Sequence, residues 1–285
     1  MVPHQSRSLL LNNVRVLLST IILVGFIPGC TTNLKAIQDF ANLSAESAEY
    51  TTLVDNYLEF PTRQKHYQPS SRHATLDSMA EERATQKEAL LLRQAIVETY
   101  MNALGRLAAD EIVDNTEELA KLTTALQTQA GTSPQETEAY EKIAGILTRV
   151  AGDRWRQGQL QDLIEQANSP IQRILAALHH IVTKGFGGDL QTEEAAIQNH
   201  YTTLIMESTD PAGKAALAEW KDFRMSQAQE RSQAVQAYGT VLKKISDEHQ
   251  ELFDRRHELD SKQLLQHVAN SVKDLRTLLE TIKTL

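Results

Sequence analysis

Apolar residues recur every three or four positions along most of this chain, and this spacing restricts the fold more than any other feature of the sequence. The stretch from 72 to 110 shows it best. Residues with this spacing lie on one face of an α-helix, and a wide stripe predicts a helix that packs on more than one neighbour. No strand-like alternation of useful length occurs, so we expect an all-α fold. The stripe consists of Leu90, Leu92, Ile96, Val97, Tyr100, Met101, Leu104, Leu107 and Ala108.

Start and stop signals divide this periodicity into successive helices joined by short connectors. Pro and Gly break helices, and Asp, Ser and Asn cap them, so their positions predict the boundaries. Besides 72–110, one helix is expected over 33–59, with a stop at Phe60-Pro61, and another over 190–207. Three more helices are expected to begin at start signals: at Asp114-Asn115-Thr116, running to about 129; at Asp210-Pro211, running to about 257; and after Leu259-Asp260-Ser261.

Two further helix starts are marked by serine followed by proline. Ser133, Pro134 and Glu136 have the spacing of a capping box with proline in the first turn. Asn168-Ser169-Pro170 repeats the signal ahead of an apolar run. The cluster Gly185-Phe186-Gly187-Gly188 then interrupts the pattern. It lacks the preceding strand and the third glycine of a dinucleotide-binding loop, so we expect a turn or hinge there.

Short connectors between long amphipathic helices predict an elongated, antiparallel helical bundle with coiled-coil-like packing. The segment after Asp210 is the longest, and about forty residues at 1.5 Å each would reach roughly 70 Å. No repeat of fixed period is strong enough to predict a solenoid. We therefore expect residues 30–285 to form a single extended helical domain, preceded by a separate leader over 1–29.

Residues 1–29 have the features of a secretory signal peptide. They contain Arg7 and Arg15 and no acidic residue, and an apolar run over 16–26 follows. That run is about half the length of ~20 residues that a helix needs to cross a bilayer. A basic start, a short apolar centre and small residues at the end predict export followed by cleavage.

The end of this leader, Ile27-Pro28-Gly29-Cys30, resembles the lipobox of bacterial lipoproteins. An aliphatic residue stands three positions before the cysteine and a small one directly before it, although Pro28 departs from the small or polar residues usual at its position. The resemblance implies cleavage between Gly29 and Cys30, attachment of a diacylglyceryl group to the Cys30 thiol, and acylation of the new amino terminus. It covers the leader only, and the helical body carries no comparable resemblance.

This lipid attachment would determine where the protein works. Several acyl chains hold a protein firmly on a membrane, so the resemblance implies a lipid-anchored protein of the cell envelope. Lipoproteins kept in the inner membrane usually carry aspartate after the cysteine, whereas this chain has Thr31. The expected location in a Gram-negative cell is therefore the outer membrane, facing the periplasm. No spacer rich in serine and glycine follows Cys30, so the helical body should lie close to the membrane.

Composition excludes several kinds of partner. Removing residues 1–29 removes two of 29 basic residues and none of 37 acidic ones, so the net charge changes from −8 to 27 minus 37, or −10. Nucleic acid binding needs a basic face, and direct binding to anionic lipid needs a polybasic segment. Neither occurs, so nucleic acid is not an expected partner. Cys30 is the only cysteine, so no disulfide and no second reactive thiol are expected.

The histidines do not form a recognisable metal site. All-α metal-carboxylate bundles use paired Glu-x-x-His motifs, and none of the nine histidines has glutamate three positions before it. Asp254 and His257 have that spacing but form a single pair. His179 and His180 point about 100° apart on a helix, and His249 and His257 lie two turns apart. We expect no metal and no cofactor.

The remaining polar and aromatic patterns have ordinary structural explanations. No Gly-x-Ser-x-Gly signature of a serine nucleophile occurs. Charged residues four positions apart suit solvent-exposed helix faces, and aromatic residues at helical spacing suit a core. The pairs are Glu117–Lys121, Glu138–Lys142 and Glu258–Lys262, and the aromatic residues expected to anchor the core are Trp155, Trp220, Tyr238 and Phe253.

The leading hypothesis is a non-enzymatic function: a lipid-anchored structural or adaptor protein that presents long helices to an envelope protein. A partner helix meeting an amphipathic helix in a groove would be the contact. The first alternative is a helical carrier of an apolar ligand, which requires a cavity along the stripe from Leu90 to Leu107. The second alternative is an enzyme of unrecognised type, which requires a cleft with perturbed titratable groups.

Overall fold

The protein is all-α in the part that the computed structural model describes, which comprises residues 33–48, 51–114, 116–127 and 133–284. Within these ranges no strand occurs, which confirms the fold class expected from the apolar spacing. None of the described helices is both long and apolar enough to cross a membrane.

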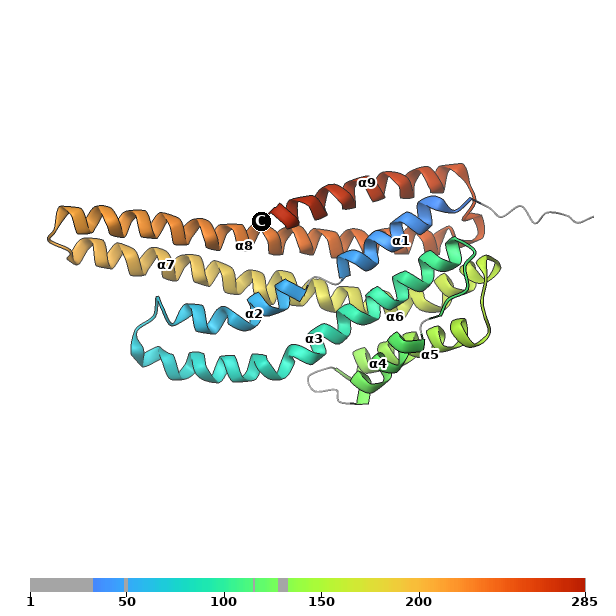
Figure 1. Ribbon diagram of the computed structural model, residues 1–285, viewed down its shortest axis with the longest axis horizontal. Coiled ribbons are helices and arrows are strands. Elements are labelled where there is room, and N and C mark those ends of the chain that lie inside the picture. The colour runs from blue at the N-terminus through green and yellow to red at the C-terminus, as the bar shows by residue number, and fades with distance from the viewer. Residues whose placement is uncertain (1–32, 49–50, 115, 128–132, 285) are drawn as a thin grey trace, which may run out of the picture. The chain divides into compact units, whose positions relative to one another are not determined.

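Long helices follow one another with short connectors (Figure 1). Short helical turns lie between some of them, at Ser70–Arg72 (η1), Gln157–Gln159 (η2), Ile181–Phe186 (η3, a π-helix) and Arg256–Glu258 (η4). The α-helices are α1 (Lys35–Ala48), α2 (Thr51–Gln64), α3 (His73–Ala108), α4 (Thr116–Gln127), α5 (Pro134–Gly152), α6 (Leu160–His180), α7 (Gly187–Glu207), α8 (Pro211–Asp254) and α9 (Lys262–Thr284).

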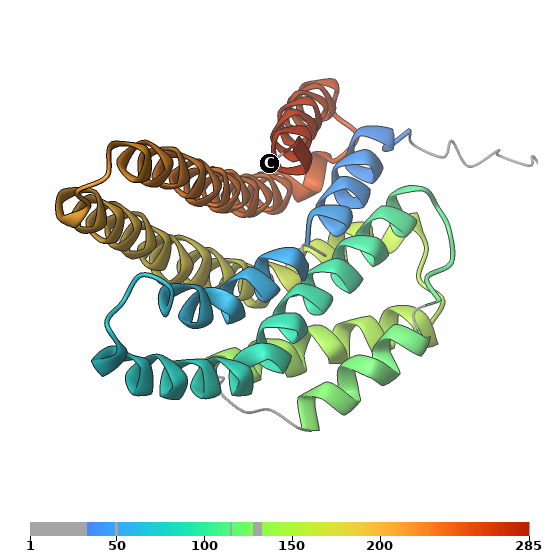
Figure 2. The same ribbon diagram turned by 60° about the vertical axis from the view of Figure 1, so that its left-hand side comes forward.

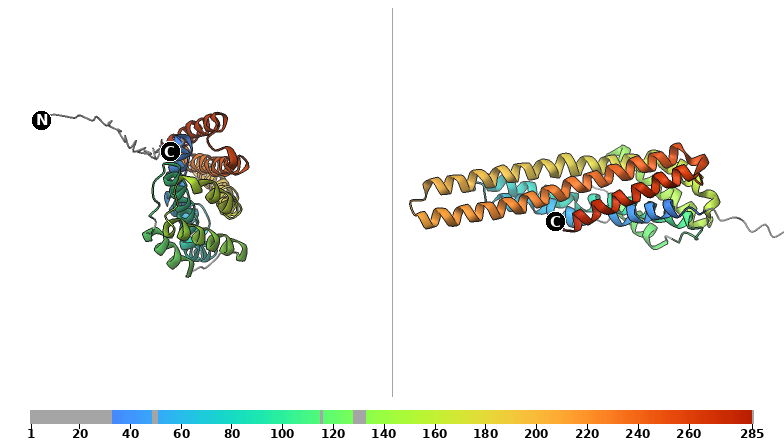
Figure 3. Two further views of the ribbon diagram at one scale, coloured as in Figure 1. Left: turned by 90° about the vertical axis from the view of Figure 1, so that its right-hand side faces the viewer. Right: turned by 90° about the horizontal axis from the view of Figure 1, so that it is seen from above.

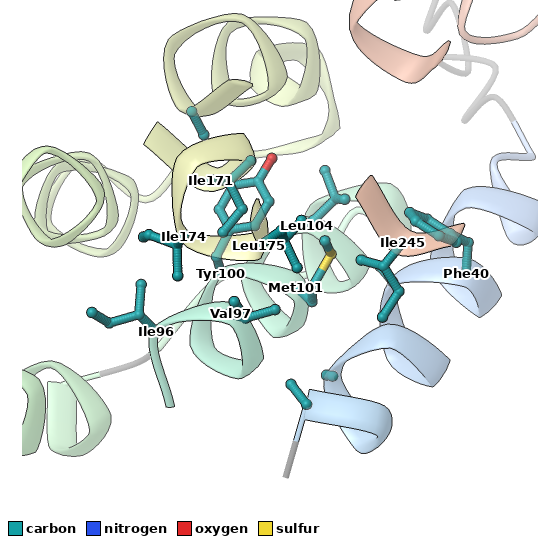
Figure 4. Close-up of a cluster of buried hydrophobic side chains, with 14 of the residues drawn as sticks. Phe40, Ile96, Val97, Tyr100, Met101, Leu104, Ile171, Ile174, Leu175 and Ile245 are labelled. Carbon is teal, nitrogen blue, oxygen red and sulfur yellow. The ribbon is translucent and has the colours of Figure 1, made fainter. Parts of the chain in front are cut away.

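The helices pack as a bundle in which α3, α6 and α8 surround the main core. Helix α1 lies against α3 and α9, α6 against α5 and α8, and α7 and α8 form an antiparallel hairpin. Helix α4 lies at the edge of the bundle, beside α3 and α5 (Figure 2). Figure 4 shows side chains of α1, α3, α6 and α8 meeting in one cluster, among them Phe40, Tyr100, Met101, Ile174, Leu175 and Ile245.

Proline at position 61 does not end a helix, so the expected stop at Phe60-Pro61 is wrong. Pro61 lies inside α2, which continues to Gln64. A proline inside a helix leaves the carbonyl four residues earlier without its donor. That carbonyl belongs to Tyr57, and Arg83 Nη1 of α3 donates a hydrogen bond to it at 2.8 Å. The segment expected as one helix over 33–59 corresponds to α1 and the first part of α2, and residues 49–50 between them lie outside the described residues.

The expected helix start at Asn168-Ser169-Pro170 is also wrong, because all three residues lie inside α6. Pro170 and Ile171 are both buried and continue the apolar face of α6. Asn168 does not cap a helix. Its Nδ2 donates to Gln250 Oε1 of α8 at 3.1 Å. Packing on α8 therefore overrides the local start signal.

The glycine cluster does not form the expected turn, because the chain stays helical there; the hinge alternative stays a prediction. Residues Ile181–Phe186 form a π-helix that runs directly into α7, and the Gly187 N–H bonds to the Val182 carbonyl. Val182 and Phe186 are buried, one turn apart. At Gly239 of α8, a β-carbon would lie 2.7 Å from Thr183 Cγ2, so this glycine permits close approach of the π-helix to α8. Burial of this side thus keeps the chain helical.

Other local signals are confirmed. Ser133 and Glu136 form the capping box of α5, with Pro134 in its first turn. Asp210 caps α8, and α9 begins just after Ser261. The helix expected from 114 to 129 is α4. Ion pairs join Glu117 to Lys121 at 2.8 Å and Glu138 to Lys142 at 2.6 Å, whereas Glu258 pairs with Arg255, not Lys262.

Candidate interaction site

The outer part of the α7–α8 hairpin, residues 198–227, has no buried side chain, and we call it the arm. Ile197 is the last buried residue of α7, and Ala228 is the first of α8. At 1.5 Å per residue, the α8 part of the arm is roughly 25 Å long. The hairpin extends past the connector between α2 and α3 (Figures 1 and 3).

Local hydrogen bonds hold the tip of the arm, where no side chain is buried. Asp210 is the N-cap of α8, and its carboxylate accepts hydrogen bonds from the backbone N–H of Ala212 at 3.3 Å and of Gly213 at 2.8 Å. Pro211 occupies the first turn, where its missing N–H costs nothing. These local bonds define a tight connection between two antiparallel helices.

An exposed aromatic patch lies on the α8 side of the arm. Trp220 and Phe223 are 52% and 51% exposed, and their rings meet edge to face with centroids 6.1 Å apart. The Arg224 guanidinium lies 5.5 Å from the Trp220 ring and 5.7 Å from the Phe223 ring. Met206 of α7 is 76% exposed. Tryptophan and arginine are the side chains that most often carry the binding energy of protein interfaces.

The expectation that Trp220 anchors the core is therefore wrong. Its spacing continues the apolar pattern of α8, but among the described residues no helix buries this part of α8. The connector after α2 reaches the arm only near its base, where the Tyr67 ring lies 5.8 Å from the His200 ring and 6.4 Å from the Tyr201 ring. Tyr238, on the same helix, is buried as expected, and Trp155 and Phe253 pack partly buried against the core. Periodicity predicts which residues share a helix face. It does not predict where along the helix that face stops meeting a neighbour.

A buried ion-pair cluster holds the base of the arm. Glu193 of α7 is 0% exposed and accepts from Arg63 Nε of α2 at 3.1 Å and from Arg231 Nη2 of α8 at 2.8 Å. Arg83 Nη2 of α3 donates to Asp189 of α7 at 2.6 Å. These pairs tie α2, α3 and α8 to the start of α7, so the arm begins from a fixed direction.

Burial affects the charges in this cluster. It raises the pKa of Asp189, although the Arg83 guanidinium opposes the shift. The same guanidinium stacks on Tyr57 and Phe60, at 4.2 and 4.8 Å from the ring centroids. A cation held between two rings and a carboxylate is immobilised, so Arg83 also secures α2 on α3. No sequence motif indicated these contacts, because the partners are far apart in the chain.

A second polar cluster lies in the core and contains His249. Its Nδ1 lies 3.0 Å from Asn168 Oδ1, which can only accept, so Nδ1 carries the proton. Nε2 then accepts from the Tyr100 hydroxyl at 2.5 Å. Burial lowers the pKa of His249 to about 3 and raises the pKa of Tyr100. The fully buried, neutral histidine joins α3, α6 and α8 and has no access to a substrate.

We did not predict from the sequence that His249 is buried, although its position contains a signal for burial. It lies four positions after Ile245 and three before Leu252, which places it within the buried stripe of α8. A histidine in that position needs hydrogen-bond partners from neighbouring helices. The sequence could have predicted a buried polar residue, but not that Tyr100 and Asn168 supply the bonds.

Ser271, Glu248 and His267 lie together between α8 and α9, but their order does not suit catalysis. Glu248 is buried, and its Oε2 accepts from the Ser271 hydroxyl and lies 3.3 Å from His267 Nε2. In a catalytic triad the histidine lies between serine and carboxylate and takes the serine proton. Here the carboxylate lies between the other two, so His267 is not placed to activate Ser271.

The remaining sequence candidates are not brought together. The described residues contain no group of three or more His, Cys, Asp or Glu that could hold a metal ion. Asp254 accepts from Gln250 at 2.8 Å, and His257 is exposed. His179 is half-buried and His180 exposed. Gly29 and Cys30, the expected cleavage and lipid sites, lie outside the described residues.

No family model, curated protein or solved structure matches the chain. The proposed function therefore starts from the fold and the arm.

Proposed function

We propose that this protein is a lipid-anchored adaptor of the cell envelope, without enzymatic activity, whose arm binds a helical partner protein. The single observation that carries the proposal is the exposed patch of Trp220, Phe223 and Arg224 on a part of the hairpin where none of the described side chains is buried. A helix with its own apolar face could pack along such a hairpin and bury the two rings.

Chain length limits how far from the helical body the lipid would be attached. Cys30 and Leu34 lie four positions apart, so the lipid would attach within about 14 Å of Leu34. Leu34 is buried beside η2 and η4, at the end of the bundle where α8 and α9 connect. The arm lies at the other end of α8, a helix of 44 residues or roughly 65 Å. In an anchored protein, most of the length of α8 would thus separate Leu34 from the arm.

The carrier alternative has weaker support inside the bundle. The cavity beside Leu90, lined also by Tyr57, Leu178 and Phe186, has a volume of about 20 Å³. A single water molecule needs about that space, and sites for drug-sized ligands occupy roughly 300 to 1,000 Å³. The enzyme alternative would need an accessible cluster of perturbed groups, whereas His249 and Tyr100 are closed off from solvent.

Photo-crosslinking in cells tests the adaptor proposal. We would place p-benzoylphenylalanine at Phe223 in the arm and, as a control, at the exposed Glu141 of α5. We expect a specific adduct from position 223 only. Adding Trp220→Ala should weaken binding by about 2 kcal/mol, roughly thirtyfold, because a buried tryptophan anchor is removed.

Two further variants determine which part of the proposal fails. Cys30→Ser should abolish the adduct if the partner is reached from the membrane, and Glu141→Ala should leave it unchanged. Equal adducts from positions 223 and 141, or an adduct that survives Trp220→Ala at full strength, would contradict a binding role for the arm. Purification of the protein with a stoichiometric lipid would favour the carrier instead.

A further inference from the structure

An open groove runs between α3 and α4, away from the arm, and we call it the α3–α4 groove. Its volume is about 960 Å³. The floor is apolar: α3 contributes Leu91, Leu92 and Ala95, and α4 contributes Leu122 and Ala125. Leu92 and Leu122 are buried, whereas Leu91 and Ala95 are only half-buried and could be covered further.

Helix α4 is incompletely packed, which leaves the groove open. Of the α4 side chains that the structure describes, from 117 to 125, only Leu122 is buried. The helix lies at the edge of the bundle, where α3 and α5 cover one side of it (Figure 2). A third helix laid along the groove would contact α3 and α4 together and bury their remaining apolar surface.

The length of the groove suits about three helical turns. On α3 its lining runs from Glu88 to Thr99, eleven positions or roughly 16 Å. Three turns of α-helix have the same length and present one apolar face of leucine- and alanine-sized side chains. An open groove of this kind suits a helix better than a small ligand, because sites for small ligands enclose most of the ligand surface.

The acidic side chains along the groove favour a helix with basic flanks. The exposed Glu88 and Glu118 line the groove, and the cation among the lining residues, Lys121, is paired with Glu117 at 2.8 Å. An acidic rim attracts basic side chains and repels anionic lipid headgroups and nucleic acids. The groove therefore combines an apolar floor with a negative border.

We propose that the α3–α4 groove binds one basic amphipathic helix of a partner protein, about three turns long, with leucine- and alanine-sized residues on its apolar face and lysine or arginine along its flanks. This site is separate from the arm, so an adaptor would hold one protein at each. The proposal does not depend on the arm or on Cys30.

The test uses the full-length protein as purified, with phosphatidylcholine as the lipid added if any is needed, because its neutral headgroups do not attract a basic peptide. The probe is a fluorescein-labelled peptide with leucine and alanine on one helical face and lysine on the flanks. A scrambled peptide of the same composition is the first control. We expect fluorescence anisotropy to show saturable binding of the amphipathic peptide, at least about tenfold tighter than the scrambled one, and weaker binding at high salt.

Matched variants locate the binding. Glu88→Lys with Glu118→Lys should weaken binding at least about tenfold, whereas Glu81→Lys with Glu141→Lys makes the same charge change at exposed positions outside the groove and should have a much smaller effect. Ala120→Trp, also exposed, fills the groove from α4 and should abolish binding. Circular dichroism melting checks that each variant is folded.

Three results would overturn the proposal. The first is no saturable binding of the amphipathic peptide. The second is equal loss of affinity with both charge-reversal pairs, which indicates attraction to an acidic protein in general. The third is binding of a fluorescent fatty acid that Ala120→Trp blocks and the peptide does not displace, which would assign the groove to an apolar ligand. None of these results bears on the arm, whose own test is the crosslink from position 223.

Discussion

Glu193 shows how a single residue connects distant parts of this chain. Its carboxylate is fully buried in α7 and contacts Arg63 of α2 and Arg231 of α8. Both arginines remain partly exposed, so the cluster combines a desolvated acid with two cations that retain some water. Removing one partner of a buried ion pair leaves uncompensated charge, which destabilises more than the loss of a surface pair.

Replacing Glu193 should therefore destabilise the fold. We expect Glu193→Ala to lower the free energy of unfolding by about 3 to 5 kcal/mol, and Glu193→Gln to lower it less because the amide still accepts hydrogen bonds. Urea unfolding followed by circular dichroism measures both. The control is Asp247→Ala, which removes the exposed Lys243–Asp247 pair and should change stability little. Equal effects of Glu193→Ala and Asp247→Ala would contradict a stabilising role for the cluster.

His249 makes stability depend on pH. Its pKa is about 3 in the folded protein, whereas an unfolded histidine has a pKa of about 6.5. Below pH 6.5 the unfolded chain therefore binds a proton that the folded one does not, and stability falls as the pH falls. Between pH 7 and pH 5 the loss from this one group should be about 2 kcal/mol.

Urea unfolding at several pH values between 5 and 7 measures this effect. The variant His249→Gln cannot titrate there, so its unfolding free energy should change much less with pH than that of the wild type. Most carboxylates remain ionised over this range, which limits their contribution. Parallel pH dependences in the two proteins would show that His249 is not the responsible group.

Helix α8 is one continuous helix that contributes to both the core and the arm. From Ala228 to Leu252 its apolar face lies in the core, and from Pro211 to Gln227 the structure buries none of its side chains. Helical hydrogen bonds alone stabilise a short helix only marginally in water. The outer part therefore depends on its caps, on contacts with α7 and on the direction fixed by the ion-pair cluster.

This difference predicts a gradient of hydrogen exchange along the hairpin. Backbone amides over 201–207 and 212–224 should exchange much faster than those over 238–252, because the arm can open without disturbing the core. Exchange measured by mass spectrometry tests this in the free protein. Uniform protection along α8 would indicate that the arm is already covered, and a dependence on protein concentration would then identify a second copy as the cover.

At the scale of the whole molecule, the proposed function rests on two features, the expected lipid at Cys30 and the arm. Leu34 is buried beside η2 and η4, and the hairpin loop lies at the other end of α8 (Figures 1 and 3). If Cys30 carries the acyl chains, most of the length of α8 separates the first buried residue after the lipid from the arm. The excess of acidic over basic residues would favour the solubility of such a protein.

Replacing Cys30 tests the anchor directly. Wild-type protein should incorporate labelled palmitate and sediment with membranes, whereas Cys30→Ser should do neither, because the thiol that accepts the lipid is gone. Ser47→Ala leaves the leader intact and serves as the control. Membrane sedimentation of Cys30→Ser without incorporated label would contradict lipid anchoring and point to attachment through another part of the chain.

Local signals in the sequence were sufficient for the fold class and for several boundaries. The apolar spacing of α3, the capping box at Ser133 and the Asp210-Pro211 start each act through bonds and side-chain directions within about one helical turn, so they can be recognised without knowing the neighbours. The resemblance of residues 27–30 to a lipobox is also a local pattern, so lipid attachment at Cys30 could be proposed without the fold.

Tertiary contacts decided the rest. Pro61 remains helical because Arg83 satisfies the Tyr57 carbonyl, and Asn168 does not start a helix because Gln250 and His249 engage its side chain. The partners in these contacts are 26 to 82 positions apart in the chain. Trp220 is exposed for a related reason: its spacing determines its helix face, but only the packing of the other helices determines where that face is left uncovered.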